Sequence, residues 1–107
     1  MKFTTIIPTY RNDESPVVDA ELDEILLALA TQFGGATNEG RTIGHWIDPV
    51  DGRHYRDEGL LISVVCENER LAEAQAAVLE IGKRLGQKAM YFEVRDFDGV
   101  RFLRLED

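Results

Sequence analysis

The chain has 107 residues, and its apolar fraction of 44% and charged fraction of 30% are those of an ordinary globular protein, so we expect one domain covering residues 1–107. Twelve basic residues stand against 20 acidic ones, and the formal net charge of −8 argues against nucleic acid and anionic membranes as partners, because both attract clustered cationic groups. The single cysteine, Cys66, excludes an internal disulfide, and no stretch of 18 apolar residues or signal-like N-terminus is present, so we expect a cytoplasmic protein.

A strand followed by a helix is predicted at the start of the chain. The β-branched and aromatic residues 2–8 are typical of a strand, and the polar residues 11–16 are typical of a turn. Asp19 is a good N-cap for a helix over residues 19–33, which ends at Gly34-Gly35. Within that helix one apolar stripe recurs at helical spacing: Leu22, Ile25, Leu26, Leu29 and Phe33.

The middle of the chain predicts two extended segments joined by a turn. Residues 41–47 favour extended structure, and the turn-forming residues 48–52 should reverse the chain. The strand that follows is interrupted by Asp57-Glu58-Gly59, where we expect a bulge or a kink. Residues 60–66 are almost entirely apolar, as in a central strand covered by helices.

The last third of the chain predicts a second helix and two more strands. The helix covers residues 69–85 and stops at Gly86, and residues 89–94 form the next strand. Asp98-Gly99 is a good two-residue hairpin turn, after which residues 100–105 alternate and return as an extra strand. The helix assignment rests on an apolar stripe at steps of three and four: Leu71, Ala74, Val78, Ile81 and Leu85.

These elements predict an α+β fold with the order β-α-β-β-α-β and an extra C-terminal hairpin strand. The simplest arrangement is a ferredoxin-like sandwich, in which one antiparallel sheet carries two helices on one face. No helix remains to cover the opposite face of the sheet. In a small chain, an open apolar face usually pairs with another subunit, so we expect a homo-oligomer, either a dimer or a trimer.

Four side chains are candidates for a binding or catalytic site. Glu58 directly precedes the most apolar strand, where a carboxylate can act as a base or anchor a cation; the alternative is a solvated ion pair with Arg56. Trp46 and Tyr55 face each other across the predicted hairpin, either as ordinary cross-strand packing or as a platform for a flat ligand. Gln87 follows the helix stop and can hydrogen-bond a ligand or loose backbone groups.

One cluster has the residue types of a metal site. His45, Asp48, Asp51 and His54 follow one another at intervals of three residues over the predicted hairpin. The two aspartates are, however, the residues that a turn around Pro49 would use in any case. With no further cysteine and no helical His-x-x-x-His pair, we predict no metal site.

Several short motifs resemble a family of small bacterial ferredoxin-like proteins of unknown function. They are Phe33-Gly34-Gly35-Ala36-Thr37, Gly44-His45-Trp46, Gly52, Glu58 and Gly86-Gln87, and they span roughly residues 33–102. The resemblance implies the ferredoxin-like fold and no particular activity.

More distantly, the same layout is similar to the phage S-adenosylmethionine lyases, which are small trimeric ferredoxin-like proteins that need no cofactor. In that family an aromatic residue follows a glycine, an acidic residue lies near the next strand and a glutamine precedes the closing hairpin. Gly44, Trp46, Glu58 and Gln87 would occupy these places. The resemblance implies that the substrate's own carboxylate attacks its γ-carbon and expels the thioether, giving homoserine lactone and methylthioadenosine. Glu58 would orient the amino-acid part or stabilise the sulfonium, and Trp46 or Tyr55 would pack on the adenine or the cation.

Three functional hypotheses follow from the sequence. The first is a domain that binds a nucleotide-like small molecule at a site between subunits. If it is an enzyme, it would be a lyase that acts on S-adenosylmethionine. The second is a non-catalytic acidic partner protein, such as a phage or mobile-element accessory factor. The third is a structural oligomerisation module.

Overall fold

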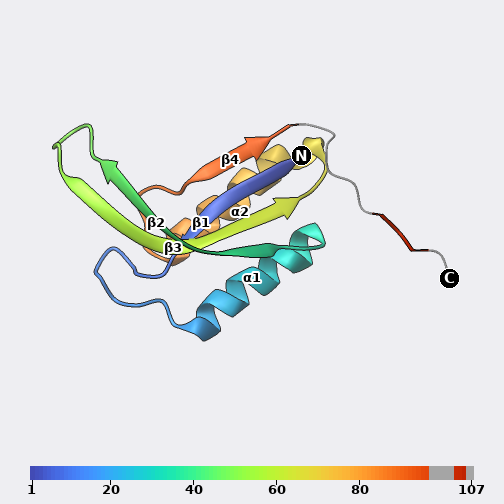
Figure 1. The fold of residues 1–107 in the computed structure, drawn as a ribbon, viewed down its shortest axis with the longest axis horizontal. Helices are drawn as coiled ribbons and strands as arrows, with labels where there is room; N and C mark the ends of the chain where they lie inside the picture. The colour runs from blue at the N-terminus through green and yellow to red at the C-terminus, as the bar shows by residue number, and fades with distance from the viewer. Residues whose placement is uncertain (97–102, 106–107) are drawn as a thin grey trace.

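The computed structural model describes residues 1–96 and 103–105. Four strands and two α-helices follow one another in the predicted order (Figure 1). Their bounds are β1 (Lys2–Pro8), α1 (Asp19–Phe33), β2 (Thr37–Ile47), β3 (His54–Val65), the 3-10 turn η1 (Asn68–Arg70), α2 (Leu71–Arg84) and β4 (Phe92–Arg95).

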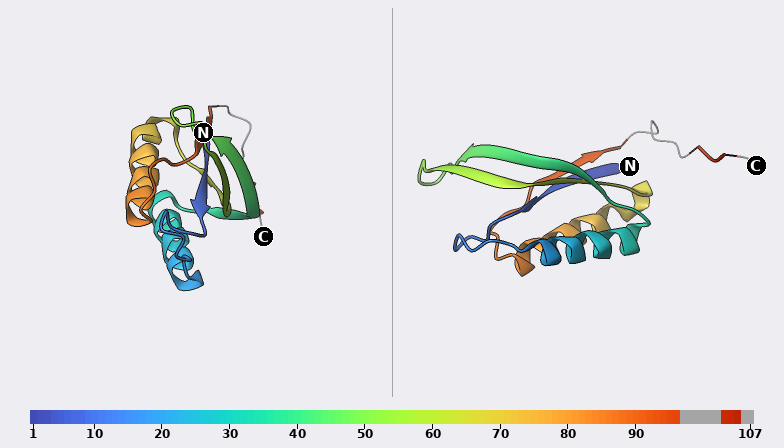
Figure 2. Two further views of the ribbon diagram at one scale, coloured as in Figure 1. Left: turned by 90° about the vertical axis from the view of Figure 1, so that its left-hand side faces the viewer. Right: turned by 60° about the horizontal axis from the view of Figure 1, so that its bottom comes forward.

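The strands form one antiparallel sheet in the order β2-β3-β1-β4. Both helices cover the same face of this sheet, and among the described residues no helix covers the other face (Figure 2). Strand β1 lies between β3 and β4, so the first strand of the chain is central and the hairpin β2–β3 forms one side of the sheet. This confirms the predicted ferredoxin-like α+β fold.

The hydrophobic core lies between the helices and the inner face of the sheet. Alternate residues of β1 point inward, and Phe3 contacts Phe33 of α1 edge-on at 5.3 Å and stacks on Phe92 of β4 at 5.6 Å between ring centroids. These contacts join one neighbouring strand, β4, and one helix, α1, at a single aromatic side chain. The buried core consists of Phe3, Ile7, Val17, Leu22, Ile25, Leu29, Phe33, Ile62, Val64, Ala74, Val78, Ile81 and Leu85.

Two ion-pair clusters join the helices to their neighbours. Arg70 donates to both oxygens of Glu73 on α2 and to the backbone carbonyl of Gln32 at the end of α1. The hydrogen bonds from Arg70 and Gln32 lower the pKa of Glu73 to about 2. At the other end of α1, Glu21 accepts hydrogen bonds from Arg11 and Arg84, and these contacts hold its pKa below the ordinary value.

The predicted interruption of the third strand is wrong. Strand β3 runs without a break through Asp57, Glu58 and Gly59, which pair in register with three consecutive residues of β2. The glycine serves a different purpose, because a Cβ atom at Gly59 would lie 2.8 Å from the carbonyl oxygen of Ile7. Gly59 therefore permits close contact between β3 and the end of β1, a common reason for glycine inside a strand.

The irregularity lies in the neighbouring strand instead. The pairing of β2 with β3 shifts by one residue between Asn38, which pairs with Ile62, and Arg41, which pairs with Leu60. Gly40 adopts a φ of 108° in this bulge, and its amide donates to the side-chain oxygen of Asn38 at 2.9 Å. Because of the extra residue, Arg41 faces the helices, whereas an unbroken alternation would turn it to the opposite face.

The C-terminal elements differ in extent from the prediction. Strand β4 is shorter than the predicted strand over residues 89–94, and the predicted turn at Asp98-Gly99 lies outside the described residues. Of the predicted extra strand, residues 100–102 also lie outside them, and residues 103–105 belong to no strand. No helix in the described part of the chain has the length and apolar character needed to cross a membrane.

Candidate functional site

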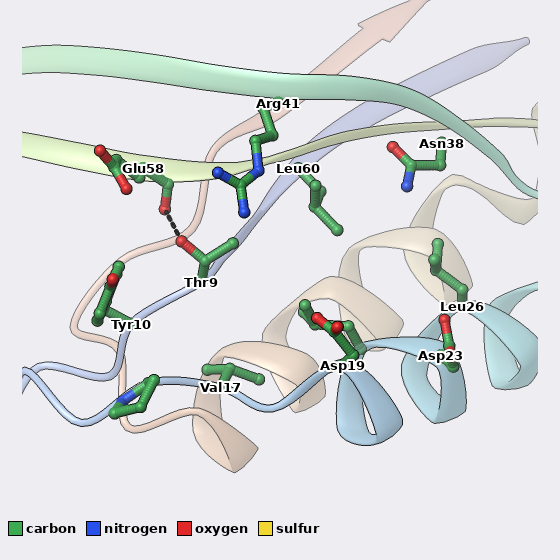
Figure 3. Close-up of a pocket in the computed structure, with 12 residues that line it drawn as sticks. Thr9, Tyr10, Val17, Asp19, Asp23, Leu26, Asn38, Arg41, Glu58 and Leu60 are labelled. Carbon is green, nitrogen blue, oxygen red and sulfur yellow. Dashed lines mark hydrogen bonds between the residues drawn. The ribbon is translucent and has the colours of Figure 1, made fainter.

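A cavity of about 490 Å³ lies between the N-terminal half of α1 and the inner face of β2 and β3 (Figure 3). Its apolar wall is formed by Leu22 and Leu26 of α1 and by Leu60 of β3. Thr9 and Tyr10, which follow β1, form its rim. The volume is within the roughly 300–1,000 Å³ that is typical of small-molecule sites.

Charged side chains line this cavity from both walls. Arg41 and Glu58 come from the strands, and Asp19 and Asp23 come from the first turns of α1. Figure 3 shows Arg41 extending from β2 into the space above α1, with the two aspartates on the helix opposite. Three carboxylates and one guanidinium among the described lining residues leave a net negative charge, and the charge stays negative when Arg56, the ion-pair partner of Glu58, is included. This charge favours a cationic ligand over an anionic one.

Glu58 lines two neighbouring cavities from strand β3. It faces the helix side of the sheet, it is half-buried and it lines this cavity and a smaller one of about 130 Å³ beside Ile43. Arg56, two residues away on the same face, donates to its carboxylate at 3.0 Å. The backbone of Glu58 is fixed separately, because its carbonyl oxygen accepts from both the amide and the hydroxyl of Thr9 at 3.0 and 3.2 Å.

Gln87 lies next to the rim of the cavity. Its side-chain amide donates to the carbonyl oxygen of Tyr10 at 3.4 Å and to that of Leu85 at 3.3 Å. Gln87 thus links the end of α2 to the segment after β1, the backbone-bonding role that a glutamine after a helix stop can take. Gln87 is not among the residues that line the cavity, but it contacts Tyr10, which is.

Trp46 and Tyr55 form a directly paired aromatic stack, with ring centroids 4.7 Å apart and an interplanar angle of 15°. They alternate with Glu58 and its partner Ile43, so they lie on the helix-free face. The Trp46 indole donates to Asp57 at 2.7 Å, and the guanidinium of Arg53 lies 5.1 Å from the Tyr55 ring centre. Within one chain the aromatic pair and Glu58 therefore belong to opposite faces of the sheet.

The four residues with metal-ligand chemistry separate into a pair and a turn. Nδ1 of His45 lies 2.9 Å from Nε2 of His54 across the hairpin. Asp48 and Asp51 instead accept hydrogen bonds from the backbone amides two residues further on, as expected of turn residues. No group of three or more metal-ligating side chains occurs in residues 1–96 and 103–105.

Sequence reasoning did not single out most of the residues that line the cavity with Glu58. Asp19 and Asp23 are four residues apart and share a helix face with Leu22 and Leu26, a spacing that could have indicated a mixed polar and apolar wall. Arg41 could not be found in this way, since it faces inward only because of the bulge.

The comparisons with known proteins support the fold. No family model matches the chain, and no curated protein is similar to it in sequence. Among solved structures, it is similar to a phage S-adenosylmethionine lyase in complex with S-methyl-5′-thioadenosine, with a TM-score of 0.70 and 12% sequence identity. The similarity covers 89% of this chain and 79% of that one, so the two folds agree over nearly the whole of this chain.

Proposed function

We propose that the cavity binds S-adenosylmethionine and that the protein is a cofactor-independent lyase acting on it. The observation that carries the proposal is the net negative cavity around Glu58, in a fold similar to that of a lyase with methylthioadenosine bound. The substrate carries a sulfonium and an ammonium group against one carboxylate, so its net charge is positive. A cavity lined by three carboxylates and one guanidinium complements that charge.

The reaction needs few groups from the protein. A carboxylate oxygen of the substrate forms a bond to its γ-carbon, and the C–S bond breaks with its electron pair moving to sulfur. The products are homoserine lactone and the neutral thioether methylthioadenosine, so no proton, metal or redox partner is required. The protein has two contributions to make: it holds the carboxylate near the γ-carbon, and it stabilises the sulfonium. Glu58 supplies negative charge that stabilises the sulfonium.

Trp46 and Tyr55 enter this proposal through a second copy of the chain. They lie on the face of the sheet opposite Glu58, so within one chain they cannot contact the same ligand. The helix-free face that carries them is also the face expected to pair with another subunit. This requires a head-to-tail assembly, in which the outer face of one copy packs against the cavity mouth of the next and its aromatic pair closes that cavity over the adenine ring.

The Glu58→Gln variant tests the proposal. We expect wild-type protein to bind S-adenosylmethionine in calorimetry and to release methylthioadenosine, measured by chromatography. Glu58→Gln should reduce binding and turnover at least about tenfold, because it removes one charge that faces a cation. Glu69→Gln, exposed on η1 and away from the cavity, is the matched control and should behave as wild type.

The outcomes separate the three functional classes. Binding without product release would identify a ligand-binding domain with no lyase activity. If the wild type binds neither S-adenosylmethionine nor any nucleoside, the proposal is wrong, and a non-catalytic partner protein or an oligomerisation module becomes the better explanation. Circular dichroism of Glu58→Gln must match the wild type, since unfolding would instead assign Glu58 a structural role.

A further inference from the structure

Apart from Glu58, which is paired with Arg56, the negative and positive charges of the cavity lie on opposite walls. Asp19 and Asp23 lie one turn apart on the same side of α1, and Arg41 extends toward them from β2 (Figure 3). Within the described residues none of these three side chains takes part in an ion pair, whereas Glu58 is held by Arg56 and Glu21 by two arginines. All three residues line the cavity and are exposed, so their hydrogen-bonding groups are open to a ligand as well as to water.

The inward position of Arg41 depends on a specific feature of the backbone. Asn38 faces the helices opposite Ile62, and regular alternation would next turn Gly40 inward and Arg41 outward. The extra residue in the bulge reverses this order. Gly40 adopts a φ of 108° in the bulge, a value that glycine tolerates and other residues rarely adopt. Bulges that re-aim one side chain are typical of functional sites, and here the re-aimed side chain is the only cationic one among the described lining residues.

We propose that the cavity recognises the α-amino-acid end of its ligand, with Arg41 binding the carboxylate and Asp19 and Asp23 binding the ammonium group. The planar guanidinium donates two parallel hydrogen bonds that match a carboxylate, and an ammonium group has three donors for carboxylate oxygens. Leu26 on the helix wall and Leu60 on the strand wall suit the aliphatic part of the amino acid. This inference rests on the proposed function and assigns three of its residues.

Other ligand ends fit the same charges less well. A phosphate or a dicarboxylate would face three carboxylates for one guanidinium, and a simple polyamine would place a cation against Arg41. A zwitterion satisfies both walls at once. In the lyase reaction the carboxylate is consumed when the lactone ring closes, so Arg41 would hold the substrate and release the product.

The test crosses four ligands with two variants in titration calorimetry. The ligands are S-adenosylmethionine, its decarboxylated form, S-methyl-L-methionine and methylthioadenosine. Arg41→Gln should weaken S-adenosylmethionine and S-methyl-L-methionine at least about tenfold, as expected for a lost charge-assisted pair, and leave the decarboxylated compound unchanged. The double variant Asp19→Asn with Asp23→Asn should weaken all three ammonium-bearing ligands and spare methylthioadenosine.

Matched controls and a conservative variant keep the test decisive. Arg95→Gln and Asp96→Asn change the same residue types in and just after β4 and should leave every affinity unchanged. Arg41→Lys keeps the charge but loses the two parallel N–H donors of the guanidinium, so it should keep only part of the affinity. Equal weakening of all four ligands by Arg41→Gln, with the wild-type circular dichroism spectrum, would overturn the inference.

Failure of the proposed function gives a different result. If the wild type binds no nucleoside, the lyase proposal falls, and nuclear magnetic resonance titration with L-methionine and S-methyl-L-methionine then decides the inference alone. Binding that Arg41→Gln removes supports an amino-acid site with another activity. Absence of binding at millimolar concentration overturns the amino-acid site as well.

Discussion

Glu58 owes its position to the residues on either side of it. Thr9 holds its carbonyl oxygen through two hydrogen bonds, and Arg56 holds its carboxylate. Gly59 completes the arrangement, because only a residue without a side chain lets β3 lie this close to the end of β1. A Cβ atom at Gly59 would be 2.5 Å from a methyl carbon of Ile6 and 2.8 Å from the backbone oxygen of Ile7.

Gly59→Ala should therefore destabilise the protein and weaken the site together. Backbone cannot yield as a flexible side chain does, so we expect a loss of about 1–3 kcal/mol in the free energy of unfolding, measured with urea. Gly82→Ala is the matched control. Its Cβ would meet only the flexible Met90 side chain, at 2.7 Å, and the gain in helix propensity of up to ~1 kcal/mol should offset that contact. Equal stability of Gly59→Ala and wild type would contradict the close approach of the two strands.

At the scale of elements, the two helices are joined at one end by Arg70. This side chain links η1 to the carbonyl of Gln32 and to Glu73, and its guanidinium lies 4.5 Å from the ring centre of Phe33. Because the ion pair is exposed, its effect should appear as a pH dependence of stability more clearly than as a large stabilisation at neutral pH.

The Glu73 carboxyl should contribute to acid sensitivity. Its folded pKa of about 2 lies below the ordinary 4.5, so its stabilising contribution is complete above pH ~4.5 and disappears as the pH falls toward 2. We expect Glu73→Gln to lower the urea midpoint relative to wild type at pH 6, and this difference to shrink steadily between pH 5 and pH 2. Glu69→Gln, exposed on η1, is the control. A difference that stays constant over this pH range would show that Glu73 acts through packing alone.

Local patterns predicted the elements far better than the site. The helix over residues 19–33 has the predicted bounds because its apolar stripe and its terminal Gly34, at a φ of 92°, are both local signals. The bulge was expected at Gly59 and occurs at Gly40, since the choice between two glycines on paired strands depends on a contact with β1 that sequence order does not reveal. Glu58 was singled out because it borders an apolar run, and it lines the cavity, but the opposing wall depends on how α1 packs over the sheet.

At the scale of the molecule, the two faces of the sheet have different environments. The inner face is covered by α1 and α2, whereas no helix of the described residues covers the outer face (Figure 2). The outer face presents Ile6, Leu61 and Val65, all half-buried. The same face carries the polar residues Thr4 and Ser63, which are 9% and 6% exposed, so it is mixed, with an apolar stripe. Such a stripe suits a second copy of the chain.

We therefore expect a homo-oligomer that pairs through the outer face of the sheet. Leu61 lies at its centre, opposite Ile6 of β1, and faces away from the cavity. Leu61→Lys should dissociate the assembly into monomers of 12.1 kDa with unchanged circular dichroism, because a charge there must be desolvated on association but remains in water in the monomer. Sedimentation velocity at micromolar concentration measures this, with Leu79→Lys on an exposed position of α2 as the control. A wild-type species of 12.1 kDa under these conditions would show that the outer face stays uncovered, and Trp46 and Tyr55 could then have no part in ligand binding.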